Sequence, residues 1–130
     1  MECPSYEVLL YNLTSCLSFL APESEPLYLR GFSPTSRSIY LEWIDIPKFQ
    51  RNGDLTGYKV LYKKFFDPQF QVQIVPFGFT SVTIEGLKPY TMYQVEVMGF
   101  NAAGDGPPDY WVNRTLEDGM ELDVSVFFLQ

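Results

Sequence analysis

The chain has 130 residues, the size of one ordinary domain, and its formal net charge at pH 7 is −7. The negative charge disfavours binding to nucleic acid or to an anionic membrane surface, and the absence of histidine excludes histidine-based catalysis and histidine metal sites. Aromatic residues make up 17% of the chain and accompany ten prolines and nine glycines, a composition that favours strands separated by turns.

Residues 1–22 are interpreted as a leader outside the domain, either poorly ordered or a weak signal-like segment. The part from 8 to 21 is apolar, but four polar side chains interrupt it, and two glutamates precede it where a signal peptide carries positive charge. The leader holds both cysteines, Cys3 and Cys16, which either form one local disulfide or stay unpaired. No long apolar run exists in the chain, so no membrane span is expected.

Turn-forming residues divide the remainder of the chain into short predicted strands. The stretch 21–26 carries two prolines and two glutamates and is interpreted as a linker, and we predict the domain over residues 23–118. The predicted strands lie within residues 27–32, 37–43, 55–66, 70–75, 81–85, 87–101 and 110–115. A turn at 33–36 ends the first strand, and the stretch 102–109 is predicted to be a loop that leaves little room for ladder bonds.

The alternation of apolar and polar side chains indicates which residues face the core. The predicted structural core residues are Trp43, Tyr58, Leu87 and Tyr93. Leu87, Pro89 and Tyr93 have the spacing of a corner found in β-sandwiches, in which the tyrosine hydroxyl bonds to upstream backbone. In the fourth predicted strand Val72 and Ile74 alternate with glutamines, and the flanking prolines indicate a sheet edge.

Seven short strands with turn signals between them predict an all-β fold, a seven-stranded immunoglobulin-like β-sandwich. The predicted strands contain no cysteine, so no inter-sheet disulfide is expected. Residues 119–130 form an apolar, alternating C-terminal tail, which a secreted single domain would be ill suited to expose. The tail is expected to pair with a sheet edge, to pack on the domain, or to begin a segment of a longer protein.

Several landmarks occur in a fixed order along the predicted domain. They are Pro26, Trp43, N-G-D-L-T-G-Y-K-V-L-Y at 52–62, the series Leu87, Pro89, Thr91, Tyr93, Val95 and Val97, N-A-A-G-D-G-P at 101–107, and T-L-E-D at 115–118. Together they resemble a fibronectin type III domain. The style is similar to that of repeats in animal cell-surface receptors and adhesion molecules, such as the sidekick, Down syndrome cell adhesion molecule and receptor tyrosine phosphatase families.

The resemblance implies a noncatalytic protein–protein interaction or spacer module of a cell-adhesion or receptor ectodomain. Its expected partners are another protein or neighbouring domains of a larger chain at the cell surface, and no cofactor or metal is expected. The chain lacks an Arg-Gly-Asp tripeptide, so an integrin-binding loop does not carry over. Two alternatives remain: an accessory module of a larger enzyme such as a receptor tyrosine phosphatase, and an intracellular scaffold of the muscle type.

One group of apolar side chains is predicted to face outward on neighbouring strands. The partner-surface candidates are Leu61, Met98, Phe100, Tyr110 and Trp111. Monomeric proteins seldom expose large apolar clusters, so such a group indicates a binding surface. The alternative is that these side chains pack against a neighbouring loop or the tail.

Two tripeptides have the sequence required for N-glycosylation, and they begin at Asn113 and Asn12. Their use requires passage through the secretory route and an exposed asparagine. Such tripeptides also arise by chance, in which case each asparagine is an ordinary polar residue.

Overall fold

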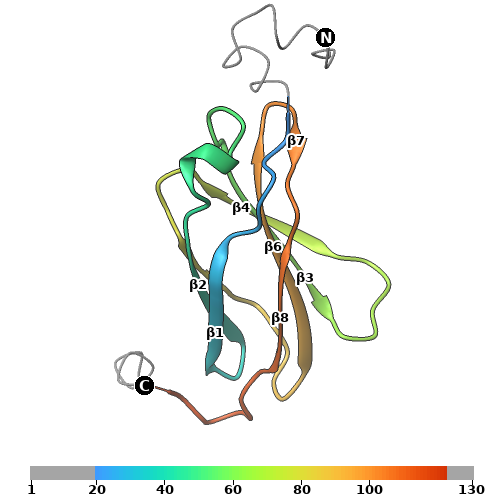
Figure 1. The fold of residues 1–130 in the computed structure, drawn as a ribbon. Helices are drawn as coiled ribbons and strands as arrows, with labels where there is room; N and C mark the ends of the chain where they lie inside the picture. Colours follow the sequence, from blue (N-terminus) through green and yellow to red (C-terminus); the bar gives the residue numbers. More distant parts are fainter. Residues whose placement is uncertain (1–19, 123–130) are drawn as a thin grey trace, which may run out of the picture.

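The computed structural model describes residues 20–122, which form a sandwich of two antiparallel sheets (Figure 1). The first sheet has the order β1 (Leu27–Thr35), β2 (Ser38–Ile44) and β5 (Ser81–Ile84). The second contains β4 (Gln71–Pro76), β3 (Gly57–Lys64), β6 (Met92–Asn101), β7 (Gly104–Asp105) and β8 (Asp109–Arg114). A short 3-10 helix, η2 (Lys48–Gln50), lies between β2 and β3. The predicted all-β, immunoglobulin-like sandwich is confirmed.

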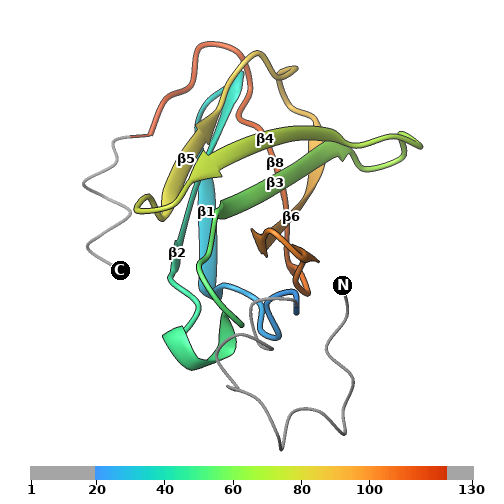
Figure 2. The same cartoon turned by 90° about the horizontal axis from the view of Figure 1, so that it is seen from above.

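β2 is the central strand of the three-stranded sheet, and β6 lies between β3 and β8 in the five-stranded sheet. In the view from above, β3 and β4 run side by side at the margin of their sheet, as their ladder requires (Figure 2). Within residues 20–122, β4 pairs only with β3, so the predicted edge position of this strand is confirmed. In the same part of the chain, β8 bonds only to β6.

The two sheets enclose one apolar core. Its buried residues are Ile39, Leu41, Trp43, Ile46, Leu55, Tyr58, Val60, Val75, Ile84, Leu87, Tyr93, Val95 and Val97. Trp43 and Tyr58 meet edge to face across the sandwich with ring centroids 5.2 Å apart. No cysteine lies within residues 20–122, so this packing joins the sheets without a disulfide.

Both buried tyrosines of the predicted core have satisfied hydroxyls. The Tyr58 hydroxyl donates to the Asp45 carboxylate at 2.6 Å and accepts from the Ile46 backbone N–H at 3.1 Å. Burial, followed by the hydrogen bond to Asp45, raises the pKa of this hydroxyl well above its usual value. The Tyr93 hydroxyl accepts from the Lys88 N–H at 2.9 Å, which is the upstream bond expected for the corner.

Two predicted loop boundaries differ from the structure. β1 continues through the predicted turn to Thr35, because a register shift between Phe32 and Thr35 accommodates Pro34, which has no N–H to donate. The predicted loop after β6 contains the two-residue strand β7. The Asn101 side chain accepts from the N–H groups of Ala103 and Gly104, and this turn brings β7 back onto β6.

The stretch interpreted as a linker is bonded to the domain at its first residues. The Asn101 amide donates to the Leu20 carbonyl at 2.8 Å, and the Asn52 amide donates to the Ala21 carbonyl at 2.7 Å. Glu23 N–H donates to the Gln50 carbonyl at 2.9 Å. Buried asparagine side chains therefore hold the first residues of the predicted linker, together with Leu20 before it, against the loops at this end.

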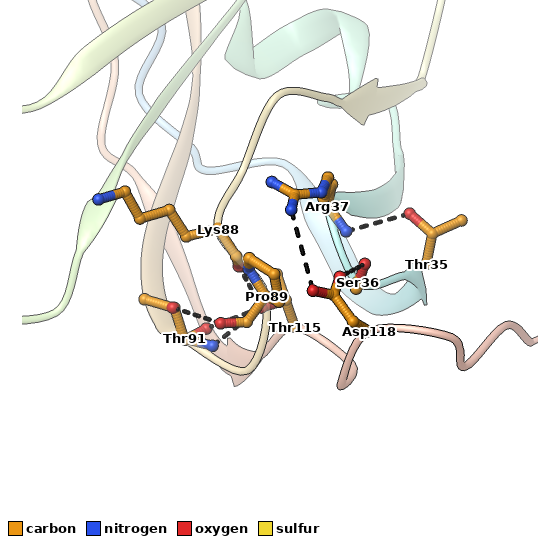
Figure 3. A network of polar contacts seen from close by, with 8 residues as sticks. All are labelled: Thr35, Ser36, Arg37, Lys88, Pro89, Thr91, Thr115 and Asp118. Carbon is orange, nitrogen blue, oxygen red and sulfur yellow. Dashed lines mark hydrogen bonds and ion pairs between the residues drawn. The ribbon is translucent and has the colours of Figure 1, made fainter.

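At the opposite end, a polar network fixes the path of the chain as it leaves β8 (Figure 3). The Thr115 hydroxyl donates to the Lys88 carbonyl at 2.6 Å and accepts from the Thr91 N–H at 2.9 Å. Asp118 accepts from the Ser36 hydroxyl at 2.8 Å and lies 3.9 Å from the Arg37 guanidinium. Beyond this network, Leu122 N–H donates to the Pro34 carbonyl at 2.8 Å. The rest of the predicted tail lies outside the described residues.

Candidate functional site

The outer face of the five-stranded sheet carries a row of side chains that crosses four strands. The register places Val72 of β4 opposite Leu61 of β3, Leu61 opposite Glu96 of β6, and Glu96 opposite Tyr110 of β8. Directly opposite side chains in antiparallel pairs lie ~5 Å apart at Cβ, so the row is continuous. We call this surface the β4–β8 face; its further members are Lys59, Ile74, Met98, Phe100 and Val112.

Much of the β4–β8 face is apolar and open to solvent. Ile74 is 50% exposed, Val72 57%, Val112 48% and Tyr110 60%. Leu61 lies between them and is partly buried. Contiguous exposed apolar side chains of this kind mark interaction sites more often than isolated ones do.

The structure brings four of the five predicted partner-surface residues to this face. Leu61 and Phe100 are partly buried there, and Tyr110 is exposed. Met98 points to the same side but is only 7% exposed, so its expected exposure is wrong. Its cross-strand neighbour Lys59 extends over the Phe100 ring.

Trp111 does not belong to the β4–β8 face. It lies opposite Val95, a core residue, and packs against the buried cluster from the open side of the sandwich. A Cβ placed on Gly31 would lie 3.1 Å from the Trp111 ring and 2.6 Å from the Tyr40 carbonyl, so only glycine leaves room for this packing. The expected outward orientation of Trp111 is wrong, because β8 turns this side chain toward the core.

The charged side chains of the β4–β8 face differ in how they are paired. The Lys59 ammonium lies 2.8 Å from Asp105 and 5.0 Å from the centre of the Phe100 ring. The Lys63 ammonium donates to the Asp67 carbonyl at 2.7 Å. Glu96 is partly buried between these lysines and has neither a hydrogen bond nor an ion pair to any side chain of the described part of the chain.

The outer face of the three-stranded sheet has a different character. There Glu42 accepts from the Arg30 guanidinium and, at 2.9 Å, from the Tyr40 hydroxyl. Burial and then the hydrogen bond to Glu42 raise the pKa of the Tyr40 hydroxyl. These groups line a shallow hollow of about 600 Å³, and they already satisfy one another.

The predicted sequon residue Asn113 is exposed on β8. Its own side-chain oxygen accepts from the Arg114 N–H at 2.7 Å. The second sequon residue, Asn12, lies outside the described residues, as do Cys3 and Cys16. Between residues 20 and 122, no three acidic, cysteine or histidine side chains gather as metal ligands, and no helix is long and apolar enough to cross a membrane.

Sequence reasoning missed five members of the β4–β8 face, which are Lys59, Val72, Ile74, Glu96 and Val112. Val72 and Ile74 are the apolar side of β4 in the sequence, yet the residue of β4 that enters the core is Val75, opposite Tyr58. Val112 shares the side of Tyr110 on β8, so its position follows from period-two alternation. The sequence shows Glu96 only as an outward polar residue of its strand. Its apolar neighbours Leu61 and Tyr110 come from other strands and follow only from the pairing between strands.

Comparisons with known proteins give a consistent result. The family model described as "Fibronectin type III domain" matches residues 24–115. Mouse protein sidekick-2 is 38% identical over 111 residues, covering 82% of this chain and 5% of that protein. Rat neural cell adhesion molecule L1 is 34% identical over 108 residues, covering 75% of this chain and 8% of that protein. The chain thus spans a small fraction of the length of each of these relatives.

Solved structures agree with these matches. The crystal structure of the FN1–FN3 domains of chicken CNTN1 has a TM-score of 0.69 and 28% identity, covering 75% of this chain and 33% of that chain. The solution structures of the fn3 domain of human contactin 1 give a TM-score of 0.67 and 25% identity, covering 80% of this chain and 87% of that chain. The family model and both solved structures therefore agree on the fibronectin type III domain.

Proposed function

The chain belongs to the fibronectin type III family, and from that premise we propose that it is a noncatalytic protein-interaction module of a larger adhesion-type protein at the cell surface. The β4–β8 face is its binding surface. The observation that carries the proposal is the continuous row from Val72 to Tyr110, in which apolar side chains at both ends are more than half exposed. Burial of such a row against a partner is favourable by roughly 25 cal/mol per Å² of apolar surface.

The relatives support the larger context. This chain matches a segment of about one domain's length in sidekick-2 and another in L1. The name of L1 describes that protein as a neural cell adhesion molecule. We infer that the module lies in a protein of comparable organisation. A catalytic domain encoded elsewhere in the full-length transcript would favour the accessory-module alternative instead.

A spacer role accompanies binding. The described chain enters the sandwich at one end and leaves at the opposite end (Figure 1). Hydrogen bonds from Asn52 and Asn101 hold the incoming segment, and Asp118 and Thr115 hold the outgoing one. A domain with both ends fixed in this way transmits a defined direction to its neighbours in a tandem array.

An extracellular location predicts that Asn113 carries an N-linked glycan, because the residue is exposed and its sequon is intact. Removal of N-glycans from the natural protein is expected to lower its mass, and Asn113→Gln is expected to abolish that change at this site. The same mass measurement is used to examine Asn12, the second sequon position. An unmodified Asn113 in the natural protein would contradict this use of the sequon and favour the intracellular alternative.

Two matched isoleucines test the binding surface. Ile74 on the β4–β8 face is 50% exposed, and Ile44 on the opposite sheet is 54% exposed. We would present the full chain as a soluble multimer to an array of recombinant cell-surface and secreted ectodomains. Ile74→Gln is expected to weaken binding roughly tenfold, as for a residue near an interface centre, and Ile44→Gln to leave it unchanged. The proposal fails if no ectodomain binds, or if both substitutions have equal effects.

A further inference from the structure

Glu96 occupies the middle of the β4–β8 face with Leu61 on one side and Tyr110 on the other. Its nearest lysine neighbours are held by other groups: Lys59 by Asp105 and the Phe100 ring, and Lys63 by Asp67 and the Phe70 ring. Within residues 20–122 the Glu96 carboxylate therefore relies on water for its hydrogen bonds.

A partner that covers the β4–β8 face removes that water. Burial of an ionised carboxylate without a compensating partner is strongly unfavourable, so an apolar ligand surface alone would be rejected here. A cationic group placed against Glu96 restores the lost interaction and becomes a source of specificity. The surface that fits this face is thus apolar with one positive charge at its centre.

The neighbouring ring selects the kind of cation. Tyr110 is 60% exposed and directly opposite Glu96, so a carboxylate and an open aromatic ring lie side by side. A guanidinium can bond to the carboxylate with two parallel N–H groups while its plane stacks on the ring, whereas an ammonium is a compact point charge. We propose that Glu96 and Tyr110 form a site for an arginine side chain of a partner protein, flanked by apolar contacts with Leu61 and Val72; this inference rests on the proposed function.

A second copy of this chain does not fit the site. The chain has four arginines, and each is already engaged: Arg30 with Glu42, Arg37 with Asp118, Arg51 with the Ile46 carbonyl, and Arg114 over the Tyr90 ring. A two-fold axis through the centre of the face would also bring two Glu96 carboxylates together, between chains that each carry a net charge of −7. The partner is therefore a different protein.

The test uses the full chain and the ectodomain array of the previous section. For each ectodomain whose binding depends on Ile74, affinities are measured for Glu96→Gln and for Glu85→Gln, a matched change at an exposed glutamate outside the β4–β8 face. Glu96→Gln is expected to weaken binding roughly 30-fold or more, and Glu85→Gln to have no effect. Thermal unfolding of both variants checks that the fold is intact.

Charge exchange then identifies the partner group. Substituting the partner's contacting arginine by lysine is expected to weaken binding roughly fivefold or more. Substituting it by glutamate is expected to abolish binding to the natural chain and to restore binding to Glu96→Arg. Binding that depends on Ile74 but is indifferent to Glu96, or that tolerates lysine fully, overturns the arginine site and leaves the proposed function intact. Absence of any binding ectodomain, or self-association through this face, overturns the inference, and only the former removes the proposed function as well.

Discussion

Two glutamates at equivalent places in the two sheets have opposite surroundings. Glu42 lies on the outer side of β2, the central strand of the three-stranded sheet, and both of its carboxylate oxygens are bonded, one to Arg30 and one to Tyr40. Glu96 lies on the outer side of β6, in the middle of the five-stranded sheet, and is surrounded by Leu61 and Tyr110. The Glu42 carboxylate has its hydrogen-bond partners within its own sheet, whereas the Glu96 carboxylate has no partner among the described residues.

Under the proposed function, this difference distinguishes a structural surface from a binding surface. A carboxylate whose partners come from its own sheet contributes to the stability of the domain, modestly where the pair is solvent-exposed. A carboxylate among apolar side chains contributes little to stability. The proposed function therefore assigns stabilisation of the domain to the outer side of the three-stranded sheet and recognition to the β4–β8 face.

Charge reversal at Glu96 gives the largest expected effect. Glu96→Arg is expected to weaken binding of the partner by about 100-fold or more, close to 3 kcal/mol, because it places two positive groups together. The melting temperature is expected to stay unchanged, since the Glu96 side chain makes no hydrogen bond or ion pair within the described residues. Surface plasmon resonance and calorimetry measure the two quantities, and a drop in stability equal to the loss in affinity would contradict a recognition role.

The second-largest effect on binding is expected at Tyr110, with Tyr28 as its matched control. Tyr110 on β8 is 60% exposed and Tyr28 on β1 is 78% exposed, but only Tyr110 adjoins Glu96. Tyr110→Ala is expected to weaken binding by about tenfold to 30-fold, as for other aromatic anchors, and Tyr28→Ala to leave it unchanged. The comparison of the two sheets breaks down if Tyr28→Ala has the larger effect in the same binding assay.

Glu42 is expected to matter for stability alone. Glu42→Gln removes the charge that Arg30 and Tyr40 contact and is expected to lower the free energy of unfolding by about 1 kcal/mol, a value reduced by the exposure of Arg30. Affinity for the partner should not change. Chemical denaturation measures the first quantity, and Arg30→Gln serves as the control that removes the same pair from its other side.

The smallest expected effect has the opposite sign. Glu96→Leu is expected to raise the free energy of unfolding by about 0.5 kcal/mol, because leucine suits a partly buried strand position among apolar neighbours. The same variant should lose binding to the partner. Denaturation in urea provides the measurement. A Glu96→Leu variant less stable than the natural chain would show that the carboxylate stabilises the fold.

The sequence predicts those parts of the molecule that depend on neighbours along the chain. The corner at Leu87 and Tyr93 spans seven residues, so its turn and its hydroxyl bond to Lys88 follow from local spacing. Trp43 and Tyr58 follow from strict alternation in β2 and β3. The confirmed sandwich rests on these local signals together with the order of the strands.

The β4–β8 face depends on pairing between strands that are distant in sequence, and the alternation of residues along one strand does not reveal its register with another. β4 offers Val72, Ile74 and Val75 on both of its sides, and only its pairing with Tyr58 decides that Val75 enters the core. Met98 is buried although it lies on the outer side of β6, and Trp111 turns inward because it pairs with Val95. The isolation of Glu96 likewise follows from three neighbouring strands at once.

Methyl-resolved NMR of the full chain tests the central claim most directly. Signals of Leu61, Val72, Ile74 and Val112 report on the β4–β8 face, and Ile44 reports on the outer side of the opposite sheet. On titration with the binding ectodomain, we expect the four methyl-bearing side chains of the β4–β8 face to shift or broaden while Ile44 keeps its position. Perturbation of Ile44 with an unchanged β4–β8 face would contradict the account.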